Sequence, residues 1–149
     1  MKIALNKKEN DNSFSLKGKE NYFAAKYLYE NFTGEIIATA FNENPYYGEK
    51  DLALKYNGKS FSRITSSNAC NKESIENLCK QYNNKEFNLT IIPQEKDFTK
   101  IGGMFLKCSD NSYLSFISLH HPNGNIGLII TDELAKIYFD YYESLKNLF

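Results

Sequence analysis

The sequence predicts an α/β protein, with an α+β arrangement as the alternative, built on a single mixed β-sheet with helices on both faces. Two helical patterns alternate with strand patterns in the first part of the chain, and a run of strands precedes a last helix. The stretch Glu35–Phe41 is almost continuously apolar, as expected for a strand covered on both faces. At 149 residues, the whole chain, 1–149, is most simply one domain.

The N-terminal part, residues 1–18, is predicted to be a strand plus a mobile polar arm, because residues 6–13 are all polar. The first helix is expected over Lys19–Phe32, and Gly34 follows where a left-handed C-cap belongs. Helical spacing predicts that its apolar stripe contains Phe23, Ala24, Tyr27, Leu28 and Phe32.

The middle of the chain is predicted to form a strand, a helix and a second strand. The stretch Asp51–Tyr56 fits either a strand or a short helix, because Leu52 and Leu54 alternate while Ala53, Leu54 and Lys55 suit a helix. The regular elements expected after the Asn57-Gly58 turn are a strand over Lys59–Thr65, a helix over Asn71–Tyr82 capped by Asn71, and a strand over Phe87–Ile92.

The last third is predicted to contain three strands and a terminal helix. The strands are Gly103–Cys108, Tyr113–Leu119 and Asn125–Ile130, and the helix opens at Thr131, a candidate N-cap. One helix face carries Leu134, Ile137, Tyr138, Tyr141, Leu145 and Leu148, and the opposite face carries Asp140, Glu143 and Lys146.

Charge and cysteine content exclude several functional classes. Lys plus Arg and Asp plus Glu number 18 each, so we expect no general nucleic-acid binding, which relies on a basic field. The three cysteines form no Cys-x-x-Cys pair, so neither a disulfide framework nor a metal site is expected, and no cofactor is indicated. Without a signal or membrane-spanning stretch, we expect a cytoplasmic protein without membrane contact.

The order of elements resembles one half of the phospholipase D-like fold. The matching segments are Glu35–Phe41, Phe61–Ile64, Phe87–Ile92, Phe105–Ser118 and Asn125–Ala135, which closes into the terminal aromatic helix. The resemblance covers roughly residues 19–149, and similar domains serve as sensor or interaction portions of bacterial regulators. Single-motif members are half of a two-lobed enzyme, so the resemblance implies a homodimer.

The family's chemistry depends on the motif His-x-Lys-x4-Asp, in which x is any residue. The His attacks phosphorus, and the Lys neutralises the charge of the phosphate. The best alignment places Phe105 at the His, Lys107 at the Lys and Ser112 at the Asp, with Asp110 two residues early. Because Phe cannot attack phosphorus, no catalytic residue is assigned. Whether the chain is an enzyme stays open, although Phe105 in place of the His indicates that it is not.

Several other residues are candidates for ligand binding. Lys107 is either a remnant of a phosphate site or a charge that protects an edge strand. Arg63 would hold an anion or, as the sequence favours, form an internal ion pair with Glu35 or Glu49.

The two histidines and a pair of tyrosines complete the candidates. His120 and His121 would act as a metal or acid–base pair, although the start of a tight turn is favoured. Tyr46 and Tyr47, at an aromatic loop tip, are candidates for partner contact.

Three functional hypotheses follow. The first is a non-catalytic phospholipase D-like domain that binds a small anionic ligand or a protein partner in a bacterial regulatory or defence setting, through Arg63, Lys107, Asp110 and the histidines. The second is a small immunity or antitoxin-type protein that blocks a toxin. The third is a divergent, metal-independent phosphodiesterase that uses His120 or His121 with Lys107.

Overall fold

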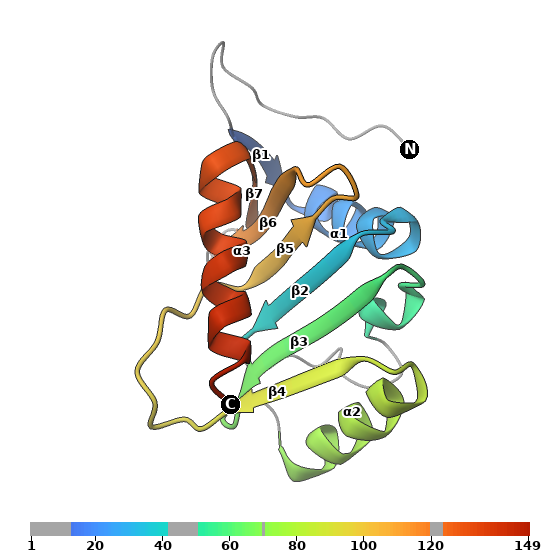
Figure 1. Ribbon diagram of the computed structural model, residues 1–149, viewed down its shortest axis with the longest axis vertical. Helices are drawn as coiled ribbons and strands as arrows, with labels where there is room; N and C mark the ends of the chain where they lie inside the picture. Colours follow the sequence, from blue (N-terminus) through green and yellow to red (C-terminus); the bar gives the residue numbers. More distant parts are fainter. Residues whose placement is uncertain (1–12, 42–50, 70, 120–123) are drawn as a thin grey trace.

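The computed structural model describes residues 13–41, 51–69, 71–119 and 124–149. These residues form one seven-stranded mixed sheet with helices on both faces, so the predicted fold class is confirmed (Figure 1). The elements are β1 (Ser13–Lys17), α1 (Lys19–Asn31), β2 (Glu35–Ala40), the 3₁₀ helix η1 (Leu52–Lys55), β3 (Ser60–Ser66), α2 (Lys72–Asn84), β4 (Asn88–Ile92), β5 (Gly103–Lys107), β6 (Tyr113–Leu119), β7 (Ile126–Thr131) and α3 (Asp132–Lys146).

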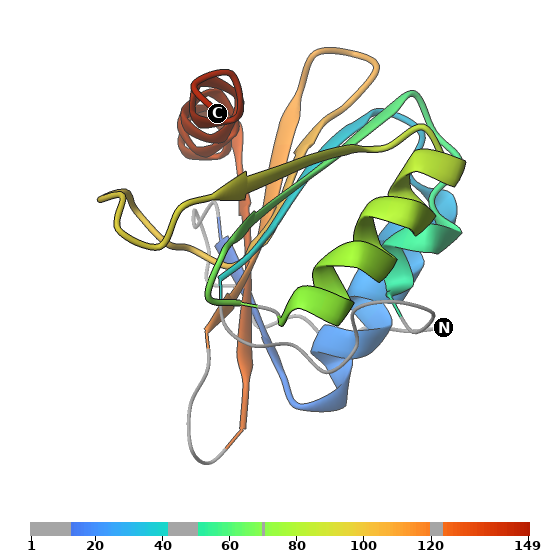
Figure 2. The ribbon, with the colours of Figure 1, turned by 90° about the horizontal axis from the view of Figure 1, so that it is seen from below.

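The sheet has a parallel half and an antiparallel half. Its strand order is β1-β7-β6-β5-β2-β3-β4; β2, β3 and β4 run parallel, and the other neighbours run antiparallel. Helices α1 and α2 cover one face, and α3 covers the other (Figure 2). Each face has its own apolar core, because successive side chains of a strand point to opposite faces.

Local hydrogen bonds explain where the helices begin. The ambiguous stretch after Asp51 is a 3₁₀ helix, and the Asp51 carboxylate accepts a hydrogen bond from the Ala53 amide at 3.0 Å. Asn71 caps α2 as predicted, since its side chain accepts from the Ser74 amide at 2.8 Å. Thr131 occupies the N-cap position of α3, but its hydroxyl donates to Asp132 instead of accepting from a helix amide.

Gly34 corrects another expectation, because it does not adopt the left-handed conformation of a C-cap glycine; the cap residue of α1 is Phe32, in extended conformation. A glycine is required there for a different reason. A Cβ atom at residue 34 would collide with the backbone carbonyl oxygen of Lys107, on the strand that pairs with β2. The close approach of two backbones therefore selects this glycine.

The predicted stripes are buried only in part: Ala24 of α1 and Leu145 of α3 lie in the core, while other members are exposed. Helix α3 buries Ala135, Phe139, Tyr142 and Leu145 against the sheet. Leu134, Ile137 and Tyr141 of α3 are exposed, as is Leu148 just beyond the helix, and Tyr138 is half-buried. In the same way, α1 buries Ala24 and Tyr29 and leaves Tyr22, Phe23 and Tyr27 exposed. Among the described residues, one group of large apolar side chains is therefore exposed on each side of the sheet.

Aromatic packing joins α3 to the centre of the sheet. The fully buried ring of Phe105 on β5 stacks on Tyr142 of α3, with 4.7 Å between centroids. The Tyr142 hydroxyl donates to the Thr99 carbonyl at 2.7 Å and accepts from the Ile101 amide at 3.0 Å. Burial raises the pKa of Tyr142 to about 12, so its hydroxyl stays protonated and tethers the loop after β4. No helix of the described residues is long and apolar enough to cross a bilayer.

We predict that Phe105→Ala lowers the free energy of unfolding by about 3–5 kcal/mol, because it opens a cavity beneath α3. The matched control is Phe23→Ala on the exposed face of α1, which should lower the free energy of unfolding by less than about 1 kcal/mol. Urea unfolding followed by circular dichroism measures both. Equal losses for the two variants would contradict this packing.

Candidate functional site

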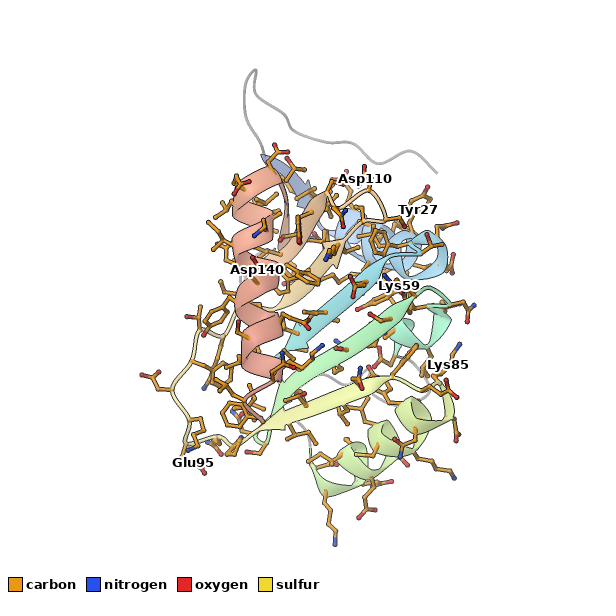
Figure 3. All side chains as sticks on the ribbon, viewed as in Figure 1. Tyr27, Lys59, Lys85, Glu95, Asp110 and Asp140 are labelled. Atoms are coloured by element: carbon orange, nitrogen blue, oxygen red, sulfur yellow. The ribbon has the colours of Figure 1, made fainter. Side chains whose placement is uncertain are left out.

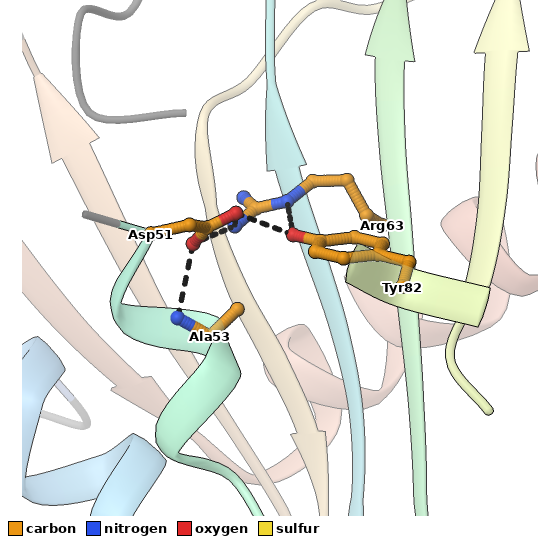
Figure 4. Close-up of polar contacts among 4 residues, drawn as sticks. All are labelled: Asp51, Ala53, Arg63 and Tyr82. Atoms are coloured by element: carbon orange, nitrogen blue, oxygen red, sulfur yellow. Dashed lines mark hydrogen bonds and ion pairs between the residues drawn. The ribbon is translucent and has the colours of Figure 1, made fainter. Parts of the chain in front are cut away.

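The most tightly organised polar cluster joins Arg63 on β3, Asp51 before η1 and Tyr82 on α2 (Figure 4). The Arg63 Nη2 atom lies 3.0 Å and 3.2 Å from the two carboxylate oxygens of Asp51, and its Nε atom donates to the Tyr82 hydroxyl at 2.9 Å. The Tyr82 hydroxyl in turn donates to Asp51 Oδ2 at 2.6 Å. The three side chains therefore form a closed ring of hydrogen bonds.

This cluster is buried, and its charges balance. Arg63 and Asp51 are only 6% and 7% exposed, and Tyr82 is fully buried. Burial raises the pKa of Tyr82 well above its usual range, which keeps the phenol protonated as a donor to Asp51. The role of this buried guanidinium is therefore structural, because separating it from Asp51 would leave two unpaired charges in the interior.

The internal ion pair predicted for Arg63 exists and joins it to Asp51, and the predicted partner Glu35 is wrong. Glu35 cannot reach Arg63, because Arg63 is in register with Ala38, and Glu35, three residues before Ala38 on β2, points to the opposite face. Glu49, the other predicted partner, lies outside the described residues. The actual partner, Asp51, belongs to the cap of η1.

Lys107 lies on the α3 side of the sheet, so it does not converge with Arg63. Its ammonium is 3.9 Å from the carboxylate of Glu35, which is its register partner on β2, and both side chains are about one-third exposed. The interpretation of Lys107 as an edge-strand charge is wrong, because β5 lies between β6 and β2 inside the sheet.

The other positions that the resemblance would align with the family motif lie apart from one another. Phe105, which the resemblance aligns with the nucleophile, is fully buried beneath α3. In the exposed turn after β5, Asp110 Oδ1 accepts hydrogen bonds from the Ser112 hydroxyl at 2.6 Å and the Ser112 amide at 3.0 Å. These bonds lower the pKa of Asp110, so its carboxylate stabilises its own turn.

The remaining predicted site residues lie outside the described residues: His120, His121, Tyr46 and Tyr47. Strand β6 begins opposite Lys107 at Tyr113 and ends at Leu119. The last described residue before the histidines is therefore at the far end of β6 from Lys107. Within the described ranges, no group of three His, Cys, Asp or Glu side chains is placed to hold a metal ion.

Sequence reasoning missed two features. Asp51 and Tyr82 carry the buried cluster, and the only local signal was an Asp that precedes the apolar Leu52-Ala53-Leu54. It also missed lysines that gather at one end of the sheet. Figure 3 shows Lys59 and Lys85 on the same side of the molecule as Tyr27. Neither lysine forms an ion pair with another described residue, although the Lys85 ammonium donates to the Asn57 side chain at 3.0 Å.

Comparisons with known proteins give one informative likeness. No protein-family profile matches the chain, and no curated protein matches it. Among solved structures, the chain is similar to TrmBL2, described as an archaeal chromatin protein with a novel mode of DNA binding. The match has a TM-score of 0.60 and 11% sequence identity and covers 95% of this chain. It covers 54% of the other chain, so it shows a shared fold over about half of that protein.

This likeness corrects the expectation of no general nucleic-acid binding. That exclusion is wrong, because a protein that shares the fold is a DNA-binding chromatin protein. Its physical basis was also weak. A net charge of zero averages over the whole surface, whereas phosphate contacts are made by local groups of lysines.

We predict strong energetic coupling between Arg63 and Asp51. Arg63→Met leaves a buried carboxylate without its cation, and Asp51→Leu leaves a buried guanidinium, so each should lower the free energy of unfolding by about 3–5 kcal/mol. The double variant should lose less than the sum by at least about 2 kcal/mol. Urea unfolding of the four proteins completes the cycle, and additive losses would show that the pair does not act as a unit.

Proposed function

We propose that this chain is a non-catalytic domain, with the architecture of one half of a phospholipase D-like fold, that binds a partner protein. One observation carries the proposal. The position that the resemblance gives to the nucleophile holds the buried ring of Phe105, while large apolar side chains stand exposed on α1 and α3. The chemistry expected at β5 is replaced by core packing, and the unsatisfied surfaces are on the helices.

The polar groups around β5 support the non-catalytic part. Glu35 approaches Lys107, and Asp110 is held by its own turn. Arg63 is directed to Asp51 on the other face of the sheet. In the described part of the chain, these groups are therefore not assembled around one reacting atom, which phosphoryl transfer requires.

The exposed helix surfaces support the binding part. Contiguous apolar patches on a monomer mark interaction sites more often than isolated exposed residues do. Tyr22 and Phe23 on α1 contact each other edge to face at 5.6 Å, and Tyr27 lies one turn further along. Aromatic residues are typical anchors of protein interfaces. We call Tyr22, Phe23 and Tyr27 the α1 aromatic surface.

The setting is also part of the proposal. A cytoplasmic, bacterial regulatory or defence role fits a domain that binds without catalysis, and an immunity-type protein that blocks a toxin would use the same surfaces. A divergent phosphodiesterase that pairs a histidine with Lys107 is the catalytic alternative.

We predict that the purified chain does not hydrolyse bis(p-nitrophenyl) phosphate above the buffer rate, because Phe105 offers no nucleophilic atom. Release of p-nitrophenolate measures this directly. Hydrolysis that Lys107→Ala abolishes would contradict the non-catalytic proposal and favour the phosphodiesterase.

Partner binding is tested in two steps. The tagged full chain first captures its partner from a lysate of its source, and calorimetry then measures the Kd with the purified partner. We expect Ile137→Asp on α3 or Tyr27→Asp on α1 to raise the Kd at least about tenfold, because a charge replaces an exposed apolar contact. A Kd unchanged in both variants would reject the helix surfaces as the binding sites.

Nucleic-acid binding is a second candidate function, favoured by the lysines at one end of the sheet. Lys59 precedes β3 and Lys85 precedes β4, and Lys107 ends β5 beside the start of β2. Tyr27 lies on the same side of the molecule (Figure 3). Lysines beside an exposed aromatic ring suit contacts with phosphates and bases, and TrmBL2, which shares the fold, is described as DNA-binding.

If this second candidate is correct, the double variant Lys59→Glu/Lys85→Glu should weaken binding to a fluorescent 30-mer duplex and flatten its salt dependence by about one unit of slope per lysine. The matched control is Lys96→Glu/Lys100→Glu, in the loop after β4, which changes the charge equally. Fluorescence anisotropy between about 50 and 200 mM salt measures both. Equal weakening by the two double variants would reject a specific site at this end of the sheet.

A further inference from the structure

Helix α3 carries an apolar stripe that the fold does not use. The stripe consists of Leu134, Ile137, Tyr141 and Leu148, which are 48%, 61%, 38% and 75% exposed, and Phe149 extends it at 49%. We call these five residues the α3 stripe. Leu134, Ile137 and Tyr141 are spaced by three and four residues, which places them along one side of α3, and Leu148 and Phe149 follow just beyond the helix end at Lys146.

The α3 stripe is separate from the surface that holds the helix on the sheet. Ala135, Phe139, Tyr142 and Leu145 are buried on a different side. The stripe borders the loop after β4, because the Tyr141 hydroxyl accepts a hydrogen bond from the Thr99 amide at 3.0 Å. Five side chains about half exposed present on the order of 400 Å² of apolar surface, which is the size of a functional patch on a monomer.

Helix α3 itself carries an excess of acidic residues. Helix α3 contains four acidic and two basic residues, and both lysines are already paired: Lys136 with Asp140 at 2.8 Å and Lys146 with Glu143 at 3.1 Å. The hydrogen bond with Asp140 raises the pKa of Lys136, and the charge of Glu133 adds to this effect. Asp140 stands on the outer surface of the helix in Figure 3.

These charges discriminate between possible occupants of the stripe. A second copy of α3 would bring its own excess of acidic groups against this one, which costs free energy. A helix with lysines or arginines beside its apolar residues would instead meet the acidic flank with charges of opposite sign.

We propose that the α3 stripe binds a basic amphipathic helix of a partner protein. This inference rests on the proposed partner-binding function and names the class of partner. The helical part of the stripe, from Leu134 to Tyr141, runs for about two turns, or about 10 Å along the helix axis, and Leu148 and Phe149 extend it past the helix end. The partner therefore needs apolar residues at three- and four-residue spacing over about 15 residues, with basic residues on the flanks.

The probes are two fluorescein-labelled 18-residue peptides of equal helicity with Leu and Ile at this spacing. One carries Lys on both flanks and the other carries Glu at the same positions. Anisotropy titrations with the full chain should show the basic peptide binding at least about tenfold more tightly at 50 mM salt, with the difference shrinking at high salt. Ile137→Asp should weaken binding of the basic peptide at least tenfold, whereas the control Tyr27→Asp should leave it unchanged.

Three results would overturn this inference: binding of neither peptide, equal binding of both, or binding that Ile137→Asp does not weaken. A stable dimer in light scattering that Ile137→Asp dissociates would also overturn it, because the stripe would then be occupied by a second copy.

Circular dichroism checks that each variant is folded, which is expected because Ile137 and Tyr27 are exposed. Loss of the captured partner by Tyr27→Asp alone would leave the proposed function standing and reject only the α3 stripe.

Discussion

The closed ring of hydrogen bonds among Asp51, Arg63 and Tyr82 is the interaction on which the parallel half of the molecule depends. It joins three elements that also share one apolar core: the cap of η1, the centre of β3 and the C-terminal half of α2. Helix α2 buries only Leu78 and Tyr82, so one of its two anchors is also a member of this ring. A buried charge pair is stable only when its hydrogen-bonding groups are satisfied. Here each of the three side chains forms hydrogen bonds with the other two.

The alternation of side chains across the sheet separates this structural cluster from the lysine at β5. Arg63 and its partners occupy the side of α1 and α2, whereas Lys107 and Phe105 face the side of α3. Phosphoryl transfer needs its groups around one atom, and the sheet prevents these two basic residues from meeting. Phe105 then has a role of its own as the ring that α3 packs on through Tyr142. Its ring thus completes the core on this face, at the position where the resemblance would place a nucleophile.

Most of the fold could be predicted from local signals, and the errors have physical causes. Asn71 caps the start of α2 as predicted, whereas Gly34 and Thr131 stand at helix ends without making the predicted cap contacts. The buried faces of the helices could not be predicted reliably, because α3 is apolar on two sides and periodicity alone does not say which side meets the sheet. Ala135 and Phe139 are buried, and Ile137 is not. The partner of Arg63 was missed because Asp51 lies in a segment whose conformation was ambiguous, and only the register of β2 and β3 excludes Glu35.

The central proposal is that this domain binds its partner through the outer surface of α3 and not through the groups around β5. A nuclear magnetic resonance titration with the purified partner tests it most directly, using the side-chain methyl groups of α3 and the backbone amides of β5 and its turn. The account predicts that the largest shifts occur at the methyl groups of Leu134, Ile137 and Leu148, while the amides of Lys107 and Ser112 stay unchanged. The largest shifts at Lys107 and Ser112, with the α3 methyl groups unmoved, would contradict it.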